Sequence, residues 1–173
     1  IKMFPFKNLL VYIMLFPIFG ILMLLFIPTR NEKLMKIIAL NSTCFSFIGS
    51  LLVWGFFQKS TGGFQFVVKF FWLPHLNLNF VLGVDGISIF FLLLTTLLVP
   101  LCLLVSWNSI SYNLKEFLIA FLLLDFFLIG VFCVLDLLLF YIFFESVLIP
   151  MYLIIGIWGS RDRKILAAYY FFL

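Results

Sequence analysis

Two acidic residues, Asp125 and Glu145, lie within long apolar runs and are the residues of this chain best placed to do chemistry. Asp125 lies ten residues before Leu135, and Glu145 lies ten residues after it. If the chain turns near Leu135 inside a membrane, both carboxyls lie at similar depth on adjacent antiparallel helices. An ionisable side chain at that depth costs about 2.5–3.5 kcal/mol on insertion scales, so it is rarely without a function. Both residues are therefore candidates for carrying protons.

More than one role is open for each candidate. The sequence favours a proton-relay or ion role for Glu145 over a structural polar contact between helices. Asp125 fits either an accessory role in proton transfer or a packing hydrogen bond. Pro150 is a second accessory candidate. It has no N–H to donate to the carbonyl of Ser146, so that carbonyl is left free. The free carbonyl either holds water beside Glu145 or simply allows a packing kink.

The composition indicates that membrane-spanning helices position these carboxyls. Of the 173 residues, 66% are hydrophobic and 10% are charged, and the mean hydropathy is +1.30. Soluble domains are roughly 45–50% apolar and about 25% charged, so a soluble enzyme is excluded. The net charge of +4 does not indicate nucleic-acid binding, because the basic residues lie in the breaks between apolar runs, as membrane topology predicts.

The apolar runs predict an all-α fold, a polytopic transmembrane helix bundle with five spans and the start of a sixth. A span needs about 20 residues. The run over 117–158 is about twice that length, and Asp136 near its middle is the expected turn. Residues 58–86 are predicted to be an extramembrane or interfacial loop, with an extended piece over 64–70. Residues 1–173 thus form one transmembrane region, with spans predicted over about 9–27, 34–57, 87–106, 117–135, 137–158 and, incomplete, 165–173.

The remaining polar residues predict orientation rather than a second site. Seven basic residues on one side face four on the other, which places the larger set in the cytoplasm or the matrix. The larger set is Arg30, Lys33, Lys36, Lys115, Arg161, Arg163 and Lys164. Cys44, Cys102 and Cys133 lie in apolar runs without CxxC spacing, so we expect three buried thiols and no metal site. His75 is expected on the surface of a loop.

Several blocks of the chain resemble a known family. In order and spacing, three blocks resemble the subunit 4 family of mitochondrial NADH dehydrogenase. They are residues 135–151 (LDLLLFYIFFESVLIPM), residues 83–88 (GVDGIS), and Trp158-Gly159 followed by a basic loop and AYYF at 168–171. The resemblance runs from about residue 70 to the end, and the first 70 residues agree in hydropathy alone. The block over 135–151 is specific, whereas the GVDG-type block is shared with neighbouring subunits.

This resemblance implies an antiporter-like subunit in the membrane arm of respiratory complex I, in the mitochondrial inner membrane. The complex passes electrons from NADH to ubiquinone and pumps protons. By motif, Glu145 falls on the glutamate that pairs with a lysine of the family's seventh helix in the proton relay. The NADH, flavin, iron–sulfur clusters and ubiquinone of the complex belong to other subunits, so no cofactor is expected on this chain.

The family's subunit continues well beyond a sixth helix, and its relay lysines lie in that later part. We therefore expect a split subunit whose second chain supplies the later helices, with truncation as the alternative. The expected partners are that chain, other membrane-arm subunits and lipid, and not nucleic acid. Two other function classes stay open. One is a related cation/proton antiporter subunit, and the other is a purely structural membrane-arm or assembly protein.

Overall fold

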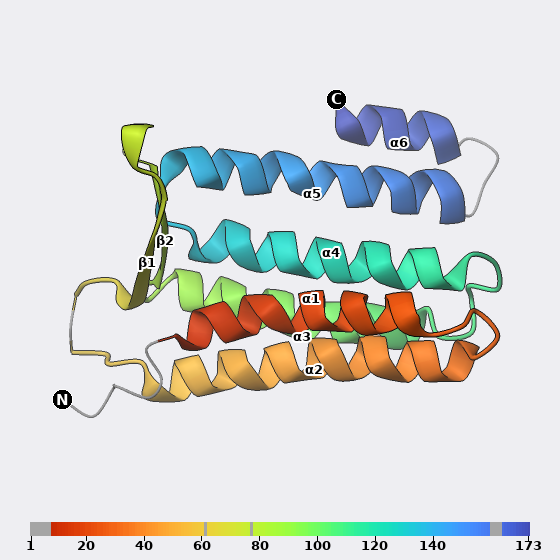
Figure 1. Ribbon diagram of the computed structural model, residues 1–173, viewed down its shortest axis with the longest axis horizontal. Helices are drawn as coiled ribbons and strands as arrows, with labels where there is room; N and C mark the ends of the chain where they lie inside the picture. The colour runs from red at the N-terminus through yellow and green to blue at the C-terminus, as the bar shows by residue number, and fades with distance from the viewer. Residues whose placement is uncertain (1–7, 61, 77, 160–163) are drawn as a thin grey trace.

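Five long helices side by side form the body of the structure (Figure 1). The structure is a computed structural model and describes residues 8–60, 62–76, 78–159 and 164–173. Its elements are α1 (Leu9–Phe26), α2 (Glu32–Phe56), β1 (Gln65–Leu73), the 3-10 turn η2 (Pro74–Leu76), β2 (Leu78–Val84), α3 (Ser88–Val105), α4 (Leu114–Cys133), α5 (Leu137–Trp158) and α6 (Lys164–Phe172). Among the described residues, α1 to α5 are the helices long and apolar enough to cross a membrane. The helical transmembrane bundle is confirmed, and the helix ends lie within a few residues of the predicted span ends.

Small residues let α1 and α2 approach each other closely. A Cβ atom on Gly20 of α1 would overlap the side chain of Ser42, and one on Gly49 of α2 would lie 2.7 Å from Cγ1 of Ile13. Helices in a membrane associate through close packing of this kind, because lipid is as apolar as the side chains and offers no hydrophobic drive between helices. The two glycines thus fix where α1 crosses α2.

Polar side chains inside the bundle satisfy backbone groups or one another. Pro17 lies within α1 and is buried, and its missing N–H frees the carbonyl of Ile13, four residues earlier. The hydroxyl of Ser46 on α2 donates to that carbonyl at 3.2 Å. One layer away, the hydroxyls of Ser50 and Thr96 form a buried hydrogen bond of 2.8 Å that joins α2 to α3. Bonds of this kind hold membrane helices in register.

The turn expected at Asp136 separates α4 from α5. The Asp136 carboxylate accepts a hydrogen bond of 2.9 Å from the backbone N–H of Leu138 and so begins α5. The two helices then run antiparallel (Figure 1). Their seam is tight, because a Cβ atom on Gly130 would lie 2.8 Å from the ring of Phe143. The rings of Phe126 and Phe127 also pack on Phe143, at 5.8 and 6.0 Å between ring centres.

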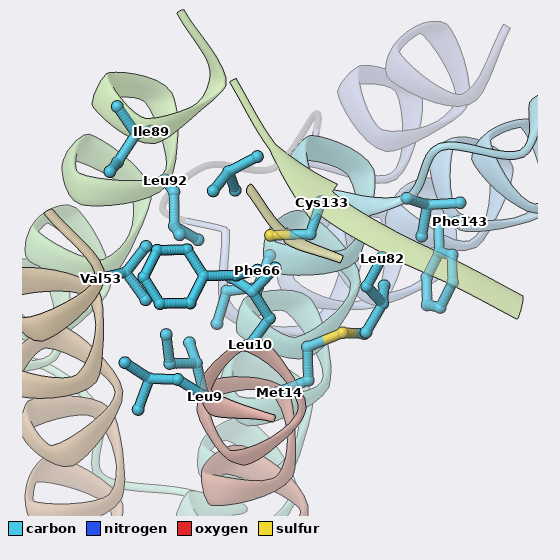
Figure 2. Close-up of a cluster of buried hydrophobic side chains, with 14 of the residues drawn as sticks. Leu9, Leu10, Met14, Val53, Phe66, Leu82, Ile89, Leu92, Cys133 and Phe143 are labelled. Atoms are coloured by element: carbon cyan, nitrogen blue, oxygen red, sulfur yellow. The ribbon is translucent and has the colours of Figure 1, made fainter. Parts of the chain in front are cut away.

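A β-hairpin covers one end of the bundle, and the sequence predicted one of its two strands. β1 covers most of the extended piece expected over 64–70, but β2 was missed. The strands pair antiparallel, with Phe70 opposite Phe80. The hairpin holds the α4–α5 turn, since the N–H of Leu135 donates to the carbonyl of Val81 at 2.9 Å. Hairpin and helix side chains share one buried cluster (Figure 2), which includes Leu10, Phe66, Leu82, Cys133 and Phe143.

The chain leaves the hairpin for α3 through Asp85. Its carboxylate accepts hydrogen bonds from the backbone N–H groups of Ser88 at 2.8 Å and Ile87 at 3.1 Å. The bond from Ser88 is the main reason that the pKa of Asp85 lies below its ordinary value, because these amides stabilise the charged form. Asp85 therefore does for α3 what Asp136 does for α5. His75 lies on η2 and is exposed, as expected.

The expectation of three buried thiols is wrong for two of the cysteines. Cys133 is buried, but Cys44 and Cys102 are exposed on the outer surfaces of α2 and α3. A helix that faces lipid is apolar on both its inner and outer faces, so an apolar run does not tell which face a cysteine occupies.

Candidate functional site

Glu145 lies in the ninth position of the 22-residue helix α5, far from either helix end. The side chain is exposed on the surface of the bundle, next to the exposed ring of Phe144. Within the described part of the chain, no hydrogen bond or ion pair engages its carboxylate. A carboxyl so placed in an apolar helix needs water or a partner from outside the described residues.

Asp125 lies in the interior of the bundle. It is 1% exposed, and neither carboxylate oxygen has a hydrogen-bond partner among the described residues. A buried polar group without a partner is costly, so such a group commonly binds a water or has a functional role. The packing hydrogen bond that the sequence left open for Asp125 is not made within the described residues.

The seam between α4 and α5 shows how the two carboxyls are related. Phe127 lies two residues closer to the turn than Asp125, and Phe143 lies two residues closer to the turn than Glu145. Their rings pack at 6.0 Å, so the seam is in the register that puts the two carboxyls at one level. They do not form a pair, however, since Asp125 is inside the bundle and Glu145 is on its surface.

Pro150 lies on a different face of α5 from Glu145. Five residues of helix turn through about 140° beyond one full turn, and Pro150 is buried where Glu145 is exposed. The carbonyl that Pro150 frees belongs to Ser146, which is half-buried. The structure therefore does not bring the proline ring to the carboxylate. Pro150 can affect Glu145 only through the free backbone carbonyl of Ser146.

The surface of α5 is much less covered than that of its neighbour. Its buried residues are Leu139, Phe143 and Pro150 alone among the described side chains, and it packs on α4 and α6. Its remaining surface is mostly exposed and apolar, with Glu145 as the carboxyl within it. An exposed apolar face with one central carboxyl can receive other transmembrane helices and bring that carboxyl to a cation or to water.

Comparisons with known proteins agree with this architecture. Residues 134–173, which begin at the α4–α5 turn, match a family model described as "NADH:quinone oxidoreductase/Mrp antiporter, TM". The fold is similar to a chain in the structure of respiratory complex I from Thermus thermophilus with bound NADH. The TM-score is 0.74 with 29% sequence identity, over 93% of this chain and 31% of that one. The class defined by fold and site is an antiporter-like membrane subunit.

Relatives of known identity show the family within that class. The NADH-ubiquinone oxidoreductase chain 4 of Chondrus crispus is 58% identical over 166 residues, which are 96% of this chain and 34% of the relative. That of Arabidopsis thaliana is 55% identical over 161 residues, 93% of this chain and 32% of the relative. The chain belongs to the NADH-ubiquinone oxidoreductase chain 4 family and spans about a third of the length of these relatives.

Proposed function

We propose that this chain is the N-terminal part of a proton-translocating subunit of respiratory complex I and that Glu145 carries the proton at mid-membrane. The observation that supports this most directly is the exposed carboxyl of Glu145 in the middle of the apolar helix α5. Glutamate can bind and release a proton, and a carboxyl at this depth is retained against a cost.

The proposal requires a cation from outside the described residues. The basic side chains that the structure describes lie at helix ends or in connections, such as Lys36 in the second turn of α2 and Lys115 at the start of α4. None of them reaches the level of Glu145. The partner would come from later helices of the same subunit, carried by a continuation of this chain or by a second chain, and would dock on the exposed face of α5.

The accessory candidates have smaller parts in this proposal. Asp125, buried at the level of Glu145, would hold a water or a proton inside the bundle. Pro150 would weaken α5 near Glu145 through the free carbonyl of Ser146. Both act on the relay without contacting the partner cation.

We assign the redox chemistry to other subunits. In this proposal the chain holds none of the NADH, flavin, iron–sulfur clusters or ubiquinone of the complex, and contributes to NADH:ubiquinone reduction by coupling it to proton transfer. The proposed location is the mitochondrial inner membrane, by analogy with the eukaryotic relatives. Its partners there would be other membrane-arm subunits and lipid.

A second candidate function has one observation in its favour. The matching family model is shared with Mrp antiporters, so a cation/proton antiporter subunit would have the same sequence features in residues 134–173. Such a subunit would transport protons against another cation and would not associate with a quinone reductase. A third reading, a structural or assembly subunit, would leave Glu145 without a role in transport.

The test is the composition and activity of the native particle that contains this chain. After mild detergent extraction and native electrophoresis, the band with this chain should oxidise NADH in the gel and yield peptides of the other complex I subunits. Peptides from the later helices, in the same or another polypeptide, should be present in equal amount. A small particle without NADH oxidation, with sodium-dependent transport in vesicles, would contradict the proposal and support the antiporter.

A further inference from the structure

A cavity with a basic lining lies at the end of the bundle where α1 connects to α2, the end that also holds the α3–α4 connection (Figure 1). Its volume is about 650 Å³. Three of its lining side chains are basic and one is acidic, so the lining has an excess of positive charge. The lining residues of this basic cavity are Arg30, Asn31, Glu32, Lys33, Leu34, Lys36, Ile37 and Trp107.

Lys36 and Trp107 form the fixed wall of the basic cavity. The Lys36 ammonium donates to the backbone carbonyl of Trp107 at 2.5 Å and lies 5.6 Å from the centre of the indole ring. Trp107 follows the end of α3, so this contact ties α2 to α3. Arg30 and Lys33 are exposed, and within the described part of the chain no hydrogen bond or ion pair engages either one. These two side chains are therefore available to a ligand.

The cavity also includes the start of α2, where backbone donors lack partners. The side chain of the N-cap residue Asn31 makes no capping hydrogen bond. The first N–H groups of a helix have no partner within the helix, and they add to the positive end of the helix dipole. With Arg30 and Lys33 beside them, these groups favour an anion with several oxygens, such as a phosphate.

The length of α2 places the cavity at the boundary of the hydrocarbon. A helix of 25 residues is about 37 Å long, whereas the hydrocarbon is about 30 Å thick. The charged residues of α2 are Glu32, Lys33 and Lys36, all near its start, so the excess length lies there and the first turn extends into the headgroup region. Trp107 suits the same boundary, where tryptophan is enriched. Leu34, in that first turn, and Ile37, in the second, are 45% and 38% exposed and continue the cavity wall toward the hydrocarbon as an apolar surface.

We propose that the basic cavity binds an anionic phospholipid, with the phosphate between Arg30 and Lys33 and the acyl chains along Leu34 and Ile37. The combination of cations, unpaired backbone donors and an apolar lower wall matches the two halves of one lipid molecule. A free phosphate would use the basic part alone. The proposal needs α2 to span a membrane, but it does not depend on the role of Glu145.

Photocrosslinking in the intact complex tests this assignment. The complex that contains this chain is reconstituted in phosphatidylcholine bilayers with a trace of photoactivatable phosphatidylglycerol, or of the matching phosphatidylcholine analogue. We expect crosslinks to the segment 28–37 from phosphatidylglycerol and at least about tenfold fewer from phosphatidylcholine. Each basic residue near a lipid phosphate contributes about fivefold, and here at least two act together.

Charge variants locate the binding site. The double variant Arg30→Gln/Lys33→Gln should lower the phosphatidylglycerol affinity by about thirtyfold, the effect of two basic residues at a lipid surface. The matched control Lys59→Gln/Lys69→Gln removes two exposed lysines at the opposite end of the bundle and should leave these crosslinks unchanged. Glu32→Gln removes the acidic residue of the lining and should increase them.

Three results would overturn the proposal. Equal crosslinking by the two lipids would mean that the anionic headgroup is not recognised. Loss of the crosslinks in 10-fold molar excess of inorganic phosphate over lipid would indicate a free-anion site. Crosslinks from the cavity to a neighbouring polypeptide, with none to lipid, would show that a protein covers it. The comparison of the two lipids uses the unaltered complex, so the proposal stays testable if the double variant fails to assemble.

Discussion

Helices α4 and α5 are antiparallel neighbours, and each has one carboxyl ten residues from Leu135 at their common turn. Their surroundings differ. α4 packs on α1, α2, α3 and α5, so Asp125 is 1% exposed. α5 packs on α4 and α6, and Glu145 is on the exposed surface. Equal depth in the membrane therefore does not imply an equal role. Of these two carboxyls, only the one on the uncovered helix can meet a side chain of a helix that packs from outside.

The largest effect is expected from Glu145→Gln. Removing the titratable group while keeping its shape should lower the protons moved per NADH oxidised by at least about tenfold, because a relay residue must bind and release a proton. Proton uptake by vesicles, normalised to NADH oxidation, measures this. Glu116→Gln, at the exposed start of α4, is the matched control and should retain full coupling. Unchanged pumping in Glu145→Gln would leave a structural role only.

The next largest effect is expected on stability, from a substitution in the seam between α4 and α5. Gly130→Leu forces a side chain into the ring of Phe143, and overpacking of this kind costs about 1–3 kcal/mol. We expect a lower midpoint temperature for the release of this chain from the detergent-extracted complex. Gly55→Leu on α2 is the control, because a Cβ atom there meets nothing within 4 Å. Equal shifts in both variants would mean that the seam is not the weak point.

Asp125→Leu separates a structural carboxyl from a functional one. Neither oxygen has a partner among the described residues, so removing the carboxyl should stabilise the complex by up to about 1–3 kcal/mol. The thermal midpoint should therefore stay unchanged or rise. Coupling should fall less than in Glu145→Gln. A coupling loss larger than that of Glu145→Gln would reverse the ranking of the two carboxyls and make the interior of the bundle the main proton site.

Pro150→Ala should have a smaller effect on coupling than Glu145→Gln. It restores the helical donor to the Ser146 carbonyl and stiffens α5 there but removes no titratable group, so we expect a loss of about twofold. The same measurement of protons per NADH checks this. A loss greater than that of Glu145→Gln would shift the emphasis from the carboxylate to the backbone near it.

The smallest effect is expected from replacing Asp85, a carboxylate outside the membrane that is hydrogen-bonded to backbone N–H groups. Its pKa is lowered because the amide of Ser88 stabilises the charged form. Its stabilisation of α3 is therefore complete above the ordinary aspartate pKa and is lost as the pH falls below about 4. Asp85→Asn should cost about 0.5 kcal/mol. Hydrogen exchange at the start of α3, corrected for intrinsic pH dependence, should be faster in the variant at pH 7, and the difference should shrink at pH 3.

Much of the bundle could be predicted because a membrane imposes simple rules on the sequence. The turn at Asp136 followed from an apolar run of twice the span length, and the helix ends followed from where charges begin. The hairpin strand β2 was missed, because its residues are as apolar as a short helical segment and no glycine-containing hairpin turn joins them to β1. The chain reverses through the 3-10 turn η2 (Pro74–Leu76) instead. The exposed positions of Cys44 and Cys102 were missed for a related reason. Hydropathy has no direction on a helix that faces lipid.

The sequence by itself determined the membrane class, the helix order and the two candidate carboxyls, since length, hydropathy and charge act locally along the chain. Only the tertiary structure decided that Asp125 is enclosed while Glu145 is on the surface, because burial depends on which helices pack together. Three pairings contribute to the packing of the bundle: Gly20 with Ser42, Gly130 with Phe143, and Ser46 with the carbonyl that Pro17 frees. Each pairing joins residues of two different helices and forms only when those helices meet. The sequence alone therefore does not reveal it.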